Sequence, residues 1–147
     1  MTSPRKPSRR QVQALLPALA GLSAAAGAAP APEALPSRAI RFEDLAVRVN
    51  GKNKSRPVLD GLTHAGFPVE MHQTELGPGM EPHPPHSHLN EELLMLREGT
   101  LEVTISGRST TLGPGGSVYV ASGEVHGWRN TGATAAHYFV IALGAKK

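Results

Sequence analysis

Apolar and polar residues alternate along most of the chain after residue 38, in short runs separated by turns rich in Gly and Pro. Alternation with a period of two is typical of strands that bury one face. We therefore predict seven or eight strands of about four to nine residues, and no amphipathic helix. The runs that predict strands are 39–49, 67–76, 91–97, 101–106, 109–112, 117–122 and 135–143. A polar turn is predicted at 50–57.

Short strands joined by tight turns in a chain of 147 residues indicate an all-β domain, either a barrel or a two-sheet sandwich. The run Leu93–Leu96 is apolar at four consecutive positions, so both faces of its strand are expected to be covered. One face would line the barrel beside Met71, Val118 and Val120. The other would meet a second sheet or a partner subunit. We therefore expect a mostly apolar cavity that suits small, partly apolar substrates.

The N-terminal residues differ in composition from the rest of the chain. Basic residues crowd positions 5–10, and a moderately apolar stretch ends in small residues of the A-x-A type. This order predicts an export signal at 1–28, a linker at 29–38 and a domain at 39–147. The apolar stretch is shorter than the roughly 20 residues of a stable membrane helix, so no stable membrane anchor is expected.

Ser8-Arg9-Arg10 resembles the core of a bacterial twin-arginine signal, which predicts a periplasmic or otherwise exported protein. A general secretory signal and a disordered basic arm are the alternatives. The basic excess belongs to this segment, because four of the 15 Lys and Arg residues precede residue 11 and all 12 acidic residues follow residue 32. The remaining 11 basic residues leave the domain near neutral, so nucleic-acid binding is not expected.

A cluster of histidines and carboxylates stands in the sequence "PHPPHSHLNEE". His86 and His88 are two residues apart, so on an extended segment they point the same way. Glu92 follows at the start of the next strand, and His126 lies just past a tight turn. Three imidazoles and one carboxylate form a typical site for a first-row transition metal with positions left open for water or substrate. The chain has no cysteine, which excludes thiolate ligands and disulfides.

The spacing of these residues resembles the two sequence motifs of the cupin family. The residues that match the first motif are His86, His88, Glu92 and Gly99. Those that match the second are Gly115, Gly123, His126 and Asn130, with Ala121 in place of the usual Pro. The resemblance implies a double-stranded β-helix, the cupin jelly-roll barrel, in which His86, His88, Glu92 and His126 bind the metal. It also implies a homodimer.

Several alternatives remain open for individual residues. Glu91 competes with Glu92 as the carboxylate ligand, although alternation puts Glu91 on the opposite face. His83 is either a loop residue or an alternative ligand. His72 either faces the cavity or lies on the surface. The whole cluster would be a set of surface residues, or the remnant of a site, if the chain bound no metal.

A site of this kind accepts one divalent transition metal, and the ligand types do not choose among Mn, Fe, Co, Ni, Cu and Zn. Twin-arginine substrates fold before export, so the ion can be loaded in the cytoplasm, which favours Fe or Mn. We expect a metal-dependent enzyme of oxygenase-like type acting on a small molecule, with its catalytic residues unassigned. A non-catalytic protein that binds or stores a small ligand through its metal is the alternative.

Overall fold

The computed structural model describes residues 33–144. The export signal predicted at 1–28 and the first residues of the predicted linker lie outside this part. The described residues form nine strands and one short 3-10 helix, η1 (Phe42–Asp44). The strands are β1 (Arg48–Asn50), β2 (Asn53–Leu62), β3 (Pro68–Leu76), β4 (Glu91–Glu98), β5 (Leu101–Ile105), β6 (Arg108–Leu112), β7 (Ser117–Val120), β8 (His126–Asn130) and β9 (Ala136–Leu143). None of the helical structure in these residues is long and apolar enough to cross a membrane.

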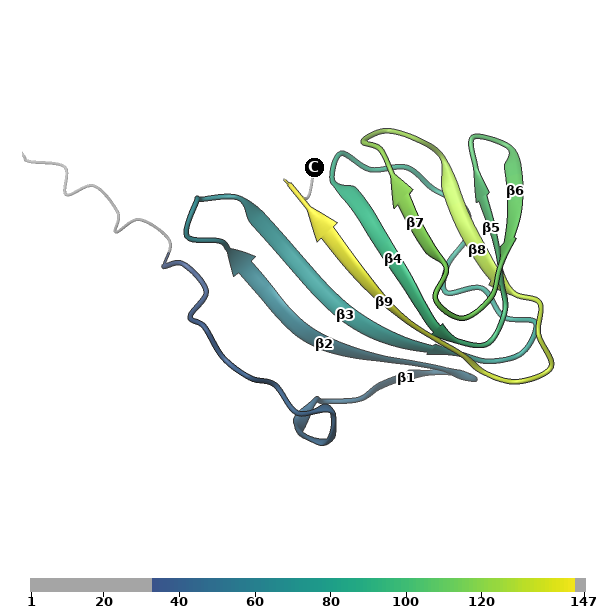
Figure 1. Ribbon diagram of the computed structural model, residues 1–147, viewed down its shortest axis with the longest axis horizontal. Coiled ribbons are helices and arrows are strands. Elements are labelled where there is room, and N and C mark those ends of the chain that lie inside the picture. The colour runs from purple at the N-terminus through teal and green to yellow at the C-terminus, as the bar shows by residue number, and fades with distance from the viewer. Residues whose placement is uncertain (1–32, 145–147) are drawn as a thin grey trace, which may run out of the picture. The chain divides into compact units, whose positions relative to one another are not determined.

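The strands form two antiparallel sheets (Figure 1). The larger sheet has the order β1-β2-β3-β9-β4-β7, and the smaller sheet has the order β6-β5-β8. Strands distant in sequence are therefore neighbours, as where β9 pairs between β3 and β4. This arrangement confirms the predicted all-β jelly-roll class.

The core is formed by the inner faces of both sheets. Leu94 of β4 pairs with Val118 of β7 and with Val140 of β9, and all three are buried. Directly paired residues share a face, so these rows point inward together. The buried core cluster contains Leu76, Leu94, Leu96, Leu101, Val103, Val118, Val120, Trp128, Ala136, Tyr138 and Val140.

The outer face of the larger sheet is less covered than the sequence predicts. Met95 lies on this face and is 42% exposed, and Tyr119 of β7 is 55% exposed. The second sheet therefore does not cover the outer face of the 93–96 run, and its cover by a partner subunit stays a prediction. Met71, predicted to line the barrel, pairs with Ile141 on the outer face instead. Its neighbour His72 pairs with the buried Val140 and takes the inner position, because alternate residues of β3 face opposite sides of the sheet.

The N-terminal part of the domain departs most from the prediction. The strand expected over 39–49 is replaced by η1 and the short strand β1. The turn expected over 50–57 is confined to the tip before β2, which runs for ten residues to Leu62. β2 accommodates Pro57 because the register with β3 shifts between Pro57 and Leu59, as at a β-bulge.

The end of the predicted linker contacts the domain. Ala34 forms a parallel bridge with Leu62, and the Leu35 backbone N–H donates to the Leu62 carbonyl at 2.8 Å. A Cβ placed on Gly61 would lie 2.9 Å from the Leu35 side chain. Residues 34 and 35 therefore lie along the end of β2, where a glycine leaves room for Leu35.

Candidate metal centre

Two backbone hydrogen bonds hold the histidine loop against β8. The His86 N–H donates to the His126 carbonyl at 3.0 Å, and the His126 N–H donates to the His86 carbonyl at 2.9 Å. The Gly123 N–H, in the turn before β8, donates to the His88 carbonyl at 2.8 Å. Gly123 has a φ of +80°, a conformation that glycine adopts without strain. The backbone therefore brings residues 40 positions apart to one place.

Three histidines converge as a result. The possible ligand atoms of His86, His88 and His126 all lie within 4.8 Å of one another, which is close enough for one metal ion to reach all three. Glu92, the second residue of β4, adjoins this group. Its two carboxylate oxygens lie 3.3 Å from the Nε2 atoms of His88 and His126. Three histidines are thus placed to bind a metal ion, and a carboxylate touches two of them.

The tautomers of two histidines follow from their hydrogen bonds. His88 Nδ1 lies 2.8 Å from the Asn90 carbonyl, and His126 Nδ1 lies 2.9 Å from the Glu124 carbonyl. A carbonyl oxygen only accepts hydrogen bonds, so each Nδ1 carries the hydrogen. In the neutral rings, both Nε2 lone pairs are left free and face Glu92. This is the orientation that second-layer carbonyls impose on metal-binding histidines.

The cluster contains buried polar atoms that have no hydrogen-bond partner among the described residues: His86 Nδ1, His88 Nε2, His126 Nε2 and Glu92 Oε2. Each such atom normally costs about 1–3 kcal/mol. Buried unpaired atoms are rare in proteins, and here they gather at one point and are all of metal-ligating types. The donor set therefore fits a divalent transition ion, which would satisfy all of these atoms together.

Burial lowers the pKa of His86 below its usual range, and the neighbouring His83, His126 and His88 lower it further. The nearby Glu92 acts in the opposite direction but more weakly. The neutral form of the His86 ring is therefore favoured, and a metal ligand must be neutral to offer its lone pair.

The alternative candidates lie in different places. Glu91 lies on the outer face and accepts a hydrogen bond from the Tyr119 hydroxyl, which raises the pKa of Tyr119. His83 is exposed, and its ring packs edge-on against His86 with the centroids 4.2 Å apart. His83 does not belong to the group of three histidines whose ligand atoms converge. It adjoins the centre and lines a cavity that Trp128 also lines.

A cavity of about 240 Å³ adjoins the centre and reaches Glu92. The sequence predicts an apolar cavity, but polar side chains make up much of this wall. They include Arg48, Asn50, Ser55, His72, Thr74 and Tyr138. The prediction fails because the sequence pattern indicates one apolar strand and a turn in this region, whereas the structure has β1 and β2, which supply the first three of these residues. The pairing of β1 with β2 and of β2 with β3 turns these residues toward the cavity.

His72 lies on the wall of this cavity and is oriented by a carboxylate. Its Nδ1 lies 3.0 Å and 3.2 Å from the two oxygens of Glu70, so Nδ1 donates to the carboxylate. Nε2 is left to hold or accept a proton. His72 and Glu70 are both on the inner face of β3, two residues apart. Of the two sequence alternatives for His72, the structure favours the cavity.

Tyr138 and Trp128 form a fixed part of the same wall. The Trp128 Nε1–H donates to the Tyr138 hydroxyl at 2.9 Å, and both residues are buried. Burial raises the pKa of Tyr138 to about 12. The phenol therefore stays protonated at physiological pH and serves as a hydrogen-bonding group rather than a base.

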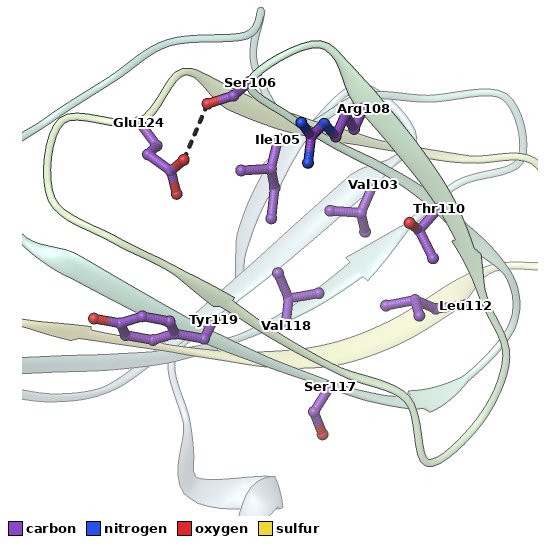
Figure 2. Close-up of a pocket in the computed structure, with 10 residues that line it drawn as sticks. All are labelled: Val103, Ile105, Ser106, Arg108, Thr110, Leu112, Ser117, Val118, Tyr119 and Glu124. Atoms are coloured by element: carbon purple, nitrogen blue, oxygen red, sulfur yellow. Dashed lines mark hydrogen bonds between the residues drawn. The ribbon is translucent and has the colours of Figure 1, made fainter.

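A second, larger cavity of about 520 Å³ lies between β5, β6 and β7 (Figure 2). Val103, Ile105 and Val118 project into it, and the Ser106 hydroxyl donates to Glu124 at 3.1 Å on its rim. None of the predicted ligands lines this cavity, and it shares no lining residue with the smaller one. Size alone favours the larger cavity, but only the smaller one reaches a residue of the cluster.

Comparison with known proteins supports the family suggested by the motifs. Residues 72–142 match the model of the cupin domain family. No curated protein matches the chain in sequence at a significant level. The described fold also resembles solved cupin structures.

Several solved structures have folds similar to that of this chain. An RmlC-like cupin from Shewanella frigidimarina is 18% identical with a TM-score of 0.63, over 76% of this chain and 95% of that one. The polyketide cyclase RemF from Streptomyces resistomycificus is 20% identical with a TM-score of 0.63, over 76% and 82%. KdgF from a Halomonas species is 14% identical with a TM-score of 0.62, over 73% and 94%. Identities this low establish the shared fold alone.

Proposed function

We propose that this chain is a mononuclear metal-dependent cupin that acts on a small molecule in the cavity beside Glu92. The observation that carries the proposal is the convergence of unpaired buried ligand atoms from three histidines and one carboxylate. Such atoms are costly in a folded protein unless something binds them. One divalent cation is the simplest partner that satisfies all of them.

His86, His88, Glu92 and His126 would hold the ion. When bound, it would supply Lewis-acid polarisation and, if it is iron, redox capacity toward O₂. Fe or Mn remains the favoured ion on the argument from loading before export. An oxygenase-like reaction is therefore the first reaction class to test.

The chain itself contributes groups that position a substrate and hold protons. His72, oriented by Glu70, presents Nε2 to the cavity and is the proposed acid–base group. The buried Trp128 and Tyr138 keep one wall rigid and restrict water. Asn53 stabilises the base of β2, because its side-chain amide donates to the Glu81 carbonyl and accepts from the Gly77 N–H.

We also propose that two copies of the chain pair through the outer face of the larger sheet. This face carries a row of mostly apolar residues in register across five strands: Leu59, Met71, Ile141, Leu93 and Tyr119. Met95 lies next to this row on the same face and is substantially exposed. A second copy would bury these side chains. We further propose that the protein is exported to the periplasm, as its N-terminal sequence suggests.

The test is turnover that depends on the metal. The full chain, loaded in turn with Fe²⁺ and Mn²⁺, is incubated with candidate small molecules while O₂ consumption and product formation are followed. Turnover that disappears on chelation and in the His72→Gln variant, with metal content unchanged in that variant, supports the enzyme. Ligand binding without turnover with either Fe²⁺ or Mn²⁺ would instead support the binding or storage protein.

A further inference from the structure

We propose that the substrate of this site carries a carboxylate group, which Arg48 binds at the far end of the cavity from Glu92. This inference rests on the proposed function, because it assigns the substrate class of the same site. It replaces the expectation of a partly apolar substrate with one derived from the polar groups that line the cavity.

The side chain of Arg48 lines the cavity and is free to bind a ligand. Within residues 33–144, no hydrogen bond or ion pair is found for its guanidinium. The other long cation on the wall, Lys54, is already paired with Glu75 at 2.8 Å. Arg48 is therefore the wall's one unpaired permanent cation among the described residues. A planar guanidinium binds a carboxylate through two parallel hydrogen bonds, which is the geometry it prefers.

The register of the larger sheet directs Arg48 toward the same cavity as the metal centre. Arg48 pairs with Ser55, Ser55 with Thr74, and Thr74 with Tyr138, so this row shares the inner face. Asn50, two residues after Arg48, points to the same side and offers a neutral donor. The polar groups of the row form a continuous path along the inner wall.

The charges at the two ends favour an anion that spans the cavity. A divalent ion held by three neutral histidines and one carboxylate keeps a net charge of about +1. Arg48 adds a second positive charge at the exposed mouth, where it also attracts incoming anions. The Glu70 carboxylate accepts a hydrogen bond from His72 and does not neutralise the positive charge of Arg48. A small molecule with one carboxylate for Arg48 and a second group that can ligate the metal suits this arrangement.

An alternative explanation is that Arg48 only protects an edge strand, since β1 lies at the edge of the larger sheet. Arg108 provides the matched comparison. It is exposed, lies on the edge strand β6 and lines the larger cavity, which contains no ligand residue. If the larger cavity binds the anion instead, Arg108 rather than Arg48 will matter.

The experiment measures binding of malonate, succinate and glutarate to the full chain loaded with Co²⁺, by calorimetry and by the visible spectrum of the ion. The neutral diamide succinamide is the uncharged comparison. We expect at least one dicarboxylate to bind and the diamide to bind far more weakly. Arg48→Gln should weaken binding about 10- to 100-fold, the usual effect of losing a charged hydrogen-bond partner. Arg48→Lys should restore part of it, and Arg108→Gln should have no effect.

The possible failures are distinguishable. Equal binding by wild type and Arg48→Gln, or no binding by any dicarboxylate, overturns the substrate inference while cobalt binding leaves the metal proposal intact. Weakened binding in Arg108→Gln also overturns it, because the anion then occupies the other cavity. Failure to bind cobalt in any form overturns the proposed function itself. Unchanged thermal midpoints in the variants exclude unfolding as the cause.

Discussion

Replacing Glu92 by Gln is the most informative single change at the proposed centre, and Glu91→Gln is its matched control. The two carboxylates are adjacent in sequence and lie on opposite faces of β4. Glu92 approaches His88 and His126 at 3.3 Å, whereas Glu91 accepts a hydrogen bond from Tyr119 on the outer face. Both changes remove one negative charge and preserve side-chain volume. Only Glu92→Gln should weaken metal binding.

The magnitude follows from the roles of these atoms. Losing a group that merely orients a metal ligand weakens binding 10- to 100-fold, so losing the carboxylate ligand should cost at least about 100-fold. At a metal concentration 100 times the dissociation constant, the ion stabilises wild type by about 2.7 kcal/mol. The same concentration would stabilise Glu92→Gln by only about 0.4 kcal/mol. For a domain of this size, Tm rises about 4 °C per kcal/mol, so the expected shifts are about 10 °C and about 2 °C.

The assay is thermal unfolding of each protein with chelator and with added metal. Without metal, Glu92→Gln should be at least as stable as wild type, because its amide N–H can donate to a histidine Nε2 that otherwise faces a carboxylate oxygen. Glu91→Gln should keep the full metal-dependent shift. A full shift in Glu92→Gln, or its loss in Glu91→Gln, would refute the assignment of Glu92.

Three further predictions concern packing and titration. Burial raises the pKa of Tyr138 to about 12 from an unfolded value of 10.0, so stability should be intact below pH 10 and fall by about 3 kcal/mol as the pH rises to 12. Chemical unfolding across this range should show a shallower fall in Tyr138→Phe. Gly99→Ala should lower the free energy of unfolding by several kcal/mol, because Gly99 has a φ of +90° and the new Cβ would lie 2.6 Å from the Ala136 Cα. An unchanged denaturation midpoint would contradict this prediction. Met95→Lys should convert a dimer to a monomer in light scattering without changing metal content, and a dimer that persists would place the interface elsewhere.

The convergence of the three histidines could be predicted from sequence because much of the evidence is local. His86 and His88 are two residues apart on an extended segment, and Glu92 begins the next strand. The contribution of His126 depended on the spacing of a second motif. The hydrogen bonds that fix the tautomers were not predictable, because they run to backbone carbonyls whose positions depend on the loop conformation.

The polar wall of the cavity was missed for a different reason. Lys54, Pro57, Asp60 and Gly61 interrupt the apolar pattern of β2, so the segment does not resemble a strand locally. It forms one because β3 supplies a pairing partner along almost its whole length. Arg48 takes its place on the wall only through the pairing of β1 with β2, and no local pattern encodes such long-range pairing.

The central claim is that one divalent ion binds where the three histidines and Glu92 meet. Elemental analysis of the protein purified from its native host, beside a His86→Ala, His88→Ala double variant, tests it most directly. We expect close to one transition-metal ion per chain in the wild type and none in the variant. Wild-type protein without metal, or a variant that retains it, would contradict the claim.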